Sequence, residues 1–250
     1  MKYLLLLIIL MSANILAEEG DTSETKTDDA QQSNWKGNVE FGYVSSSGNT
    51  DTTNMNGKFH VEAAYNNWTQ LFYAATFSSS NKEDTTAERF KLAYQGDRKL
   101  SDKSYFFVST EYEKDRFSGF QYRASATSGY GRILYNENNM SLDGEVGIGA
   151  RKSETDIDLL TGSSTSEIEG IMKLAMKYQW QIEKNKSLES KLTVDPGMDT
   201  TISNFEIAFI TMIVGDLSMK ASYAARHVSD VPAEKNNLNT VTKLNLLYAF

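Results

Sequence analysis

The sequence contains no cysteine among its 250 residues, and only two prolines and two histidines. The lack of cysteine excludes disulfides, thiol catalysis, cysteine-ligated zinc and a lipid-modified lipoprotein N-terminus. Proline lacks the backbone N–H that a β-ladder needs, so its scarcity beside sixteen glycines and thirteen tyrosines favours continuous β-structure. Stability must then come from hydrogen bonding and burial alone.

Long apolar runs are also missing beyond the N-terminus, where no stretch approaches the roughly 20 residues of a membrane-spanning helix. The mean hydropathy of −0.44 would by itself indicate a soluble chain. A transmembrane strand, however, alternates apolar and polar side chains and averages to a neutral hydropathy. The composition therefore disfavours a bundle of membrane helices and is compatible with a β-barrel.

The first 17 residues are typical of a cleaved signal peptide. Lys2 precedes an apolar run at 4–11, and Ala17 is a small residue suited to cleavage. An uncleaved membrane anchor is the alternative, which the short apolar run disfavours. Residues 18–34 carry six carboxylates against one lysine, so we expect a disordered acidic periplasmic tail there. The folded domain is then expected at 35–250.

Apolar residues recur at every second position from Trp35 onward. The clearest segment is 167–183, in which an apolar series at 168–182 alternates with Glu, Lys and Gln. A helix would scatter these charges around its surface, whereas a strand places them on one face. Eleven further segments alternate in the same way, among them Leu71, Tyr73, Ala75 and Phe77. We expect the apolar series of each strand to face lipid and the intervening residues to face a lumen.

The connections between these segments alternate in length. Tight polar turns are expected at 66–67, 97–103, 136–139, 183–186 and 215–216. Mostly longer polar loops are expected at 45–51, 78–87, 114–119, 152–165, 195–203 and 230–237. Short turns inside and long loops outside are typical of bacterial outer-membrane barrels. The sequence therefore predicts an all-β fold, a closed antiparallel transmembrane β-barrel of about 12 strands in the outer membrane; a soluble sandwich or lipocalin-like barrel is the alternative.

Aromatic residues near the expected turns should mark the inner membrane interface. These residues are Tyr65, Trp68, Tyr178, Trp180 and Tyr248.

The last strand ends in a phenylalanine. Leu246, Tyr248 and Phe250 alternate along it, and such a strand edge can be recognised by strand addition. We expect these three residues to form the signal for the outer-membrane assembly machinery, in addition to facing lipid.

The segment Trp35-Lys36-Gly37-Asn38-Val39-Glu40-Phe41-Gly42-Tyr43, followed by Ser47-Gly48-Asn49-Thr50-Asp51, resembles a bacterial family described as salt-induced outer-membrane proteins. The resemblance covers about 35–250, with the opening motif as its specific part. It implies an outer-membrane barrel in a domain of unknown function, with a link to salt or osmotic adaptation. It implies no activity, cofactor or catalytic residue.

The residues out of phase with the apolar series give the expected lumen lining. The main candidates are Lys58, His60, Glu62, Arg89, Lys91, Arg123, Glu145, Lys173, Lys177 and Arg226. The expected lumen face carries eleven bases, which are the seven Lys and Arg residues of this list together with Arg151, Lys191, Lys220 and Lys243. It carries eight acids: Glu40, Glu62, Glu111, Asp143, Glu145, Glu169, Glu189 and Glu206. The expected interior is therefore slightly basic. Such a lumen is either filled by ion pairs or forms a narrow passage for small polar or anionic solutes, since a 12-stranded barrel lies between the filled and the open sizes.

Other candidate sites are weaker. The loop at 47–51 could offer oxygen ligands to Ca²⁺, but its glycine and Asn/Asp residues are explained by a hairpin loop. Gly147 and Gly149 suit small residues facing a crowded lumen rather than a phosphate loop, because no helix follows them. An outer-membrane hydrolase built on His60 or His227 with a neighbouring Ser or acid is the alternative function, although no local catalytic motif supports it.

The expected partners are outer-membrane lipid, lipopolysaccharide and the assembly machinery. An acidic secreted chain without a basic patch is not expected to bind nucleic acid, and no cofactor is expected. The sequence does not predict an oligomeric state, nor the identity of a solute.

Overall fold

The computed structural model describes residues 34–46, 52–81, 84–116, 120–155, 164–231 and 236–250. The predicted signal peptide, most of the predicted acidic tail and the loop at 47–51 lie outside these residues. The strands are β1 (Asn34–Ser46), β2 (Thr52–Tyr65), β3 (Trp68–Asn81), β4 (Asp84–Ser101), β5 (Ser104–Asp115), β6 (Phe120–Glu137), β7 (Met140–Thr155), β8 (Ser166–Glu183), β9 (Lys186–Pro196), β10 (Thr201–Val214), β11 (Leu217–Val228) and β12 (Leu238–Ala249).

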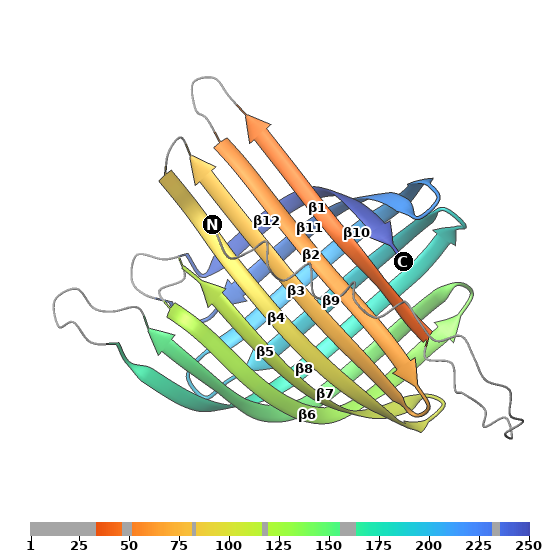
Figure 1. Ribbon diagram of the computed structural model, residues 1–250. Helices are drawn as coiled ribbons and strands as arrows, with labels where there is room; N and C mark the ends of the chain where they lie inside the picture. Colours follow the sequence, from red (N-terminus) through yellow and green to blue (C-terminus); the bar gives the residue numbers. More distant parts are fainter. Residues whose placement is uncertain (1–33, 47–51, 82–83, 117–119, 156–163, 232–235) are drawn as a thin grey trace, which may run out of the picture. The chain divides into compact units, whose positions relative to one another are not determined.

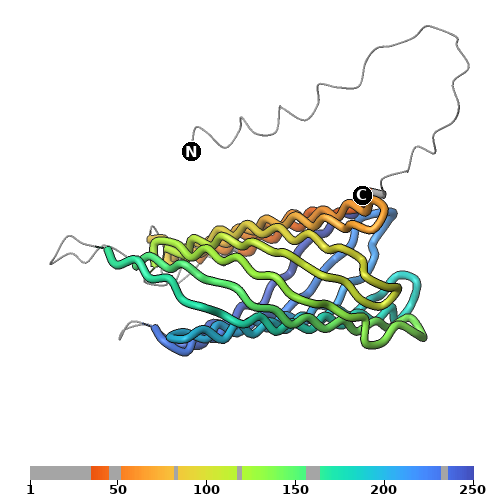
Figure 2. The backbone as a smooth tube through the Cα atoms, turned by 90° about the horizontal axis from the view of Figure 1, so that it is seen from below, coloured from red at the N-terminus to blue at the C-terminus, as the bar shows by residue number. Residues whose placement is uncertain are grey.

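These twelve strands form one closed antiparallel barrel in which each strand pairs with its neighbours in sequence and β12 returns to β1. Figure 1 shows the strands inclined to one another, and Figure 2 shows the barrel from the side. The all-β, 12-stranded closed barrel predicted from the alternation is confirmed.

Tight turns join the strands at one end of the barrel, which we call the turn end. Asn66, Asn138, Asn139 and Gly215 adopt positive φ of 54°, 53°, 61° and 54° there, a backbone region that Asn and Gly tolerate in two-residue hairpins. The other end, called the loop end, carries the remaining connections. Barrels of this class place short turns in the periplasm, which is the orientation that we expect here.

Several strands extend further than the alternation predicts. The expected turn at 97–103 is replaced by strand up to Ser101, and the expected loop at 78–87 is mostly a continuation of β3 and β4. A ladder needs only backbone groups, so it continues where both faces are polar and the apolar period has disappeared. The turns and loops are therefore shorter than expected.

The outer surface of the barrel is apolar and the inside is polar. Large apolar side chains such as Ile148, Ile168 and Phe41 are more than half exposed. The charged residues Glu40, Arg151 and Lys220, in contrast, are at most 6% exposed. Tyr65, Trp68 and Tyr248, near the turn end, are about half exposed on the apolar side. A closed antiparallel barrel with an apolar outer surface and a polar interior is typical of outer-membrane proteins. The chain is therefore an outer-membrane β-barrel.

Strand β3 is the exception to the predicted phase. Leu71, Tyr73 and Ala75 are the Cα partners of Glu62, His60 and Lys58 on β2, and directly opposed residues of an antiparallel pair share a face. Leu71, Tyr73, Ala75 and Phe77 therefore line the lumen, and the prediction that they face lipid is wrong. Because Trp68 and Phe72 make the other face apolar too, alternation alone could not assign the faces of β3.

A large apolar side chain also fills part of the lumen. Phe107 on β5 is fully buried, and a Cβ built on Gly129 or Gly147 would lie 2.9 or 2.8 Å from its ring. The two glycines on β6 and β7 thus make room for the phenyl ring against the wall. This is the crowding that the sequence predicts for Gly147.

Candidate functional site: the barrel lumen

The lumen is bridged from wall to wall near the loop end. Arg226 on β11 contacts Glu113 on β5, half of the barrel circumference away in strand order, through Nη2–Oε1 at 2.7 Å and Nη1–Oε2 at 3.0 Å. Both residues lie two positions from the loop-end termini of their strands and both are buried. A bidentate guanidinium–carboxylate pair is among the strongest and most directional of protein hydrogen bonds.

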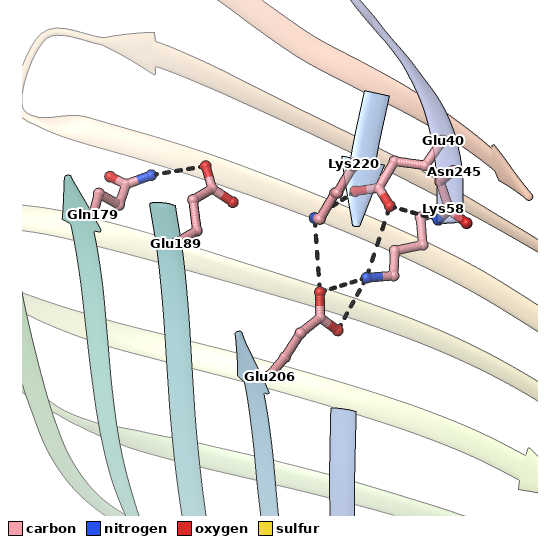
Figure 3. A network of polar contacts seen from close by, with 7 residues as sticks. All are labelled: Glu40, Lys58, Gln179, Glu189, Glu206, Lys220 and Asn245. Atoms are coloured by element: carbon pink, nitrogen blue, oxygen red, sulfur yellow. Dashed lines mark hydrogen bonds and ion pairs between the residues drawn. The ribbon is translucent and has the colours of Figure 1, made fainter. Parts of the chain in front are cut away.

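A second polar network lies at mid-height on one side of the lumen (Figure 3), where β10, β11, β12, β1 and β2 are consecutive neighbours. Lys58 on β2 contacts Glu206 on β10 at 2.8 Å and Glu40 on β1 at 3.9 Å. Lys220 on β11 contacts Glu40 at 2.8 Å and Glu206 at 3.7 Å, and the Asn245 amide donates to Glu40 at 3.0 Å. Two bases and two acids therefore neutralise each other in a network contributed by five strands.

Other pairs lie along the wall between adjacent strands. Arg89 and Asp115 are cross-strand partners of β4 and β5 with an Nη2–Oδ2 distance of 2.7 Å. Lys91 contacts Glu111 at 2.7 Å on the same two strands. These pairs neutralise charge without spanning the lumen.

The connection between β9 and β10 folds onto another pair at the loop end. Arg151 on β7 and Glu169 on β8 contact at 2.7 Å, and both are buried. Glu169 accepts hydrogen bonds from the backbone N–H groups of Asp199 and Thr200 at 3.1 and 3.3 Å, and Arg151 donates to the Thr200 carbonyl. The pair thus anchors the connection at 197–200 to the inner wall.

Charged side chains near the turn end are paired less completely. Glu145 accepts hydrogen bonds from Gln95 and Tyr105, both at 2.9 Å. Lys177 and Lys191 are Cα partners on β8 and β9 and are exposed, and within the described residues neither has a carboxylate within 4.0 Å. Two like charges directly opposite one another are unfavourable in a sheet.

The other predicted lumen residues are distributed between the loop-end and the turn-end halves of the lumen. Lys173 donates to Ser109 at 3.2 Å and lies 5.4 Å from the centre of the Phe107 ring. Arg123 is buried, with its guanidinium carbon 3.7 Å from the Phe120 ring centre. Glu62 contacts Lys36 at 2.9 Å. Each predicted lumen candidate therefore lies on a strand and on the face opposite the exposed apolar series.

The free space in the lumen differs between the two ends. Beside the Arg226–Glu113 bridge a cavity of about 30 Å³ is lined by Arg123, Arg151 and Asn204 among others. A cavity of about 260 Å³ opens near the turn end beside Gln179, Gln181 and Glu189. The smaller of these two cavities therefore lies beside the cross-lumen bridge.

The interior is not basic, in contrast to the expectation. Glu113 and Asp115 continue the alternation of Glu111, while Asp97 accepts from Gln95 and Asp195 lines the small cavity. These four acids face the lumen as well, and so does Lys36, the Cα partner of Glu62, so acids and bases are nearly equal in number there. Continuing the two-residue period to the strand ends would have found them.

The two histidines lie apart from one another in the barrel. His60 on β2 faces the lumen, while His227 on β11 is exposed on the other face. Within the described residues, no hydrogen bond or ion pair joins either imidazole to a hydroxyl or carboxylate side chain. The arrangement that would favour a hydrolase is therefore not assembled around either histidine in the described part of the chain.

The chain terminus closes the barrel. Gly37 and Phe250 exchange backbone hydrogen bonds of 2.8 and 2.9 Å, and a Cβ on Gly37 would lie 2.7 Å from the Phe250 ring. Phe59 stacks on the same ring at 6.5 Å between centroids. A glycine of the opening motif thus accommodates the final side chain, while the role of Phe250 in assembly stays a prediction.

Comparison with known proteins is consistent with this architecture. The chain is 25% identical over 242 residues to the uncharacterized protein YdiY of Escherichia coli strain K12, covering 96% of this chain and 93% of YdiY. The fold is similar to the COG4313 outer membrane channel from Pseudomonas putida F1, with a TM-score of 0.52 and 11% identity over 91% of this chain and all of that one. The translocator domain of the autotransporter NalP from Neisseria meningitidis gives a TM-score of 0.49 and 11% identity, over 86% and 88% of the two chains.

All of the barrel except the first residues of β1 lies in the region that matches a family model. That model, described as "Protein of unknown function, DUF481", matches residues 39–250. The chain therefore belongs to the DUF481 family.

Proposed function

We propose that this outer-membrane barrel has a structural or narrow-channel role and is closed along its axis to solutes larger than water and small ions. The observation that carries the proposal is the bidentate Arg226–Glu113 contact, which joins opposite walls near the loop end. General diffusion would require an unobstructed path past this bridge.

The dimensions support a closed axis. The cavity beside the bridge, of about 30 Å³, has room for about one or two waters. The Lys58–Glu206 contact, between strands a third of the circumference apart, narrows the lumen at a second level. A solute of sugar or amino-acid size would have to pass the Arg226–Glu113 contact, which joins opposite walls.

Passage of small polar or anionic solutes is a second candidate. The exposed Lys177 and Lys191 favour it at the turn end. The nearly balanced interior charge argues against strong anion selectivity, because a selective constriction needs a surplus of one sign. The link to salt or osmotic adaptation stays a prediction from the family resemblance.

Removing the bridge tests the proposal. We expect purified wild-type protein to give slow swelling of liposomes in small sugars, and Arg226→Ala/Glu113→Ala to raise the swelling rate several-fold. The matched control is Arg89→Ala/Asp115→Ala, which removes the same pair of charges at a similar height but along one wall. Fast swelling with the wild type, or an equal increase with the control, would contradict closure by the bridge.

A further inference from the structure

The seam between the first and last strands is only partly hydrogen-bonded. β1 pairs with β12 from Asn38↔Ala249 to Phe41↔Leu246, and Gly37 and Phe250 extend this pairing by one step. β1 continues to Ser46 and β12 begins at Leu238, yet the β1–β12 ladder includes neither 42–46 nor 238–245. Figure 1 shows the two strands diverging away from the C-terminus.

Both unpaired edges belong to ordered strands. Residues 42–46 remain paired with β2, and residues 238–245 all remain paired with β11. The sequence would also permit a closed seam, because continuing the register opposes Tyr43 to Leu244, two exposed residues of the same face. The lack of pairing is therefore not caused by a break in either strand.

The point of divergence is filled by polar side chains. A Cβ at Gly42, in the interior, would collide with the amides of Asn56 and Asn245. It would also lie 3.0 Å from the Leu244 carbonyl oxygen, so β12 is still next to β1 at this position and the strands separate beyond it. Asn56 and Asn245 are 7% and 2% exposed, and the Oδ1 atoms of both find no hydrogen-bond partner in the described part of the chain. Buried amide oxygens without a partner are uncommon in proteins, and here they lie where the two strands separate.

The seam on the other side of this point is strongly closed. Inside the barrel, Glu40 on β1 accepts from Lys220 on β11 and from Asn245 on β12. Outside it, the Phe250 ring packs on Gly37 and Phe59. The turn-end half of the seam is thus fixed by backbone, ion-pair and aromatic contacts together.

We infer that the loop-end half of the β1–β12 seam is a lateral opening from the lumen to the adjoining membrane leaflet, bounded at Gly42 and Asn245. In hydrocarbon, unpaired backbone N–H and C=O groups are unfavourable, so the edges at 42–46 and 238–245 must contact water or polar groups of another molecule. The opening lies between other strands than the axial bridge, since neither Arg226 nor Glu113 belongs to β1 or β12, although Arg226 is the Cα partner of Asn239 on β12.

The absence of native cysteine makes disulfide mapping of the seam direct. The test variant is Tyr43→Cys/Leu244→Cys. The first control is Phe41→Cys/Leu246→Cys, which joins Cα partners in the paired half of the β1–β12 seam. The second control is Tyr43→Cys/Met55→Cys, which joins Cα partners of β1 and β2 at the height of the test pair. All three are oxidised in vesicles after folding has been verified by heat-modifiability.

We expect both controls to cross-link, and the test pair to react roughly ten-fold more slowly, because a disulfide requires Cα atoms within about 7 Å. Equal cross-linking of the test pair would overturn the opening.

A second measurement uses proteins that carry one cysteine each. A fluorophore attached to Lys243→Cys, next to the opening, should be quenched by lipids with brominated acyl chains. The same fluorophore on Lys173→Cys, on the paired β8 wall, should not be quenched. Equal protection at both positions would also overturn the opening.

Discussion

The lumen near the loop end and the lumen near the turn end accommodate charge differently. Near the loop end, Arg226 and Glu113 are buried and joined across the barrel, with a cavity of only about 30 Å³ beside them. Near the turn end, Lys177 and Lys191 are exposed side by side, and a cavity of about 260 Å³ opens nearby. One lumen can thus hold buried, paired charges in one half and exposed like charges in the other, which a count of charges alone does not show.

The largest expected effect concerns the buried bridge. Arg226→Ala leaves the Glu113 carboxylate buried without its bidentate partner, and we expect a loss of about 3–5 kcal/mol in the free energy of unfolding. Urea unfolding of the vesicle-folded barrel measures this loss.

Lys177→Ala is the matched control at the turn end. Its ammonium is exposed and has no ion pair within the described residues, so we expect a change within about 0.5 kcal/mol. If both variants lost the same stability, the difference between the two ends would be refuted.

A smaller effect is expected where the glycines accommodate Phe107. Gly147→Ala would place a Cβ 2.8 Å from the Phe107 ring and 2.7 Å from the Ser128 carbonyl oxygen, and overpacking of this kind costs about 1–3 kcal/mol. Gly170→Ala on the neighbouring strand would meet only the Met198 sulfur at 4.0 Å. The same urea experiment should show no loss for Gly170→Ala, and a loss shared by both variants would exclude the ring contact as the cause.

The smallest effect should be a gain of stability at the turn end. Lys191→Glu replaces a like-charge pair with Lys177 by an attractive one, which is worth about 0.2–1 kcal/mol between cross-strand partners. The gain should shrink at 1 M salt, where the Debye length falls to about 3 Å. A gain that does not depend on salt would indicate a cause other than charge.

The repetitive part of the fold could be predicted from the sequence. Alternation identifies the twelve strands because lipid outside and charge inside impose opposite chemistry on successive residues. It fails on β3, where Leu71 and Tyr73 face the lumen while Trp68 and Phe72 make the outer face apolar. When both faces carry apolar side chains, only the pairing with a neighbouring strand decides the phase.

The contacts inside the lumen could not be predicted from the sequence. Arg226 and Glu113 are 113 positions apart, and their meeting depends on the barrel closing with five strands between theirs on either side. Alternation identifies the face of Arg226, but it contains no information about which side chain of the opposite wall lies within reach. The association of Phe107 with Gly129 and Gly147 has the same origin, because it depends on the register of three strands.

Planar-bilayer recording of the purified wild-type barrel tests the axial closure most directly. The account predicts only a small conductance with no strong preference between anions and cations, because the Arg226–Glu113 pair joins opposite walls of the lumen and the interior charge is nearly balanced. A stable, large, ohmic conductance in the wild type would contradict it.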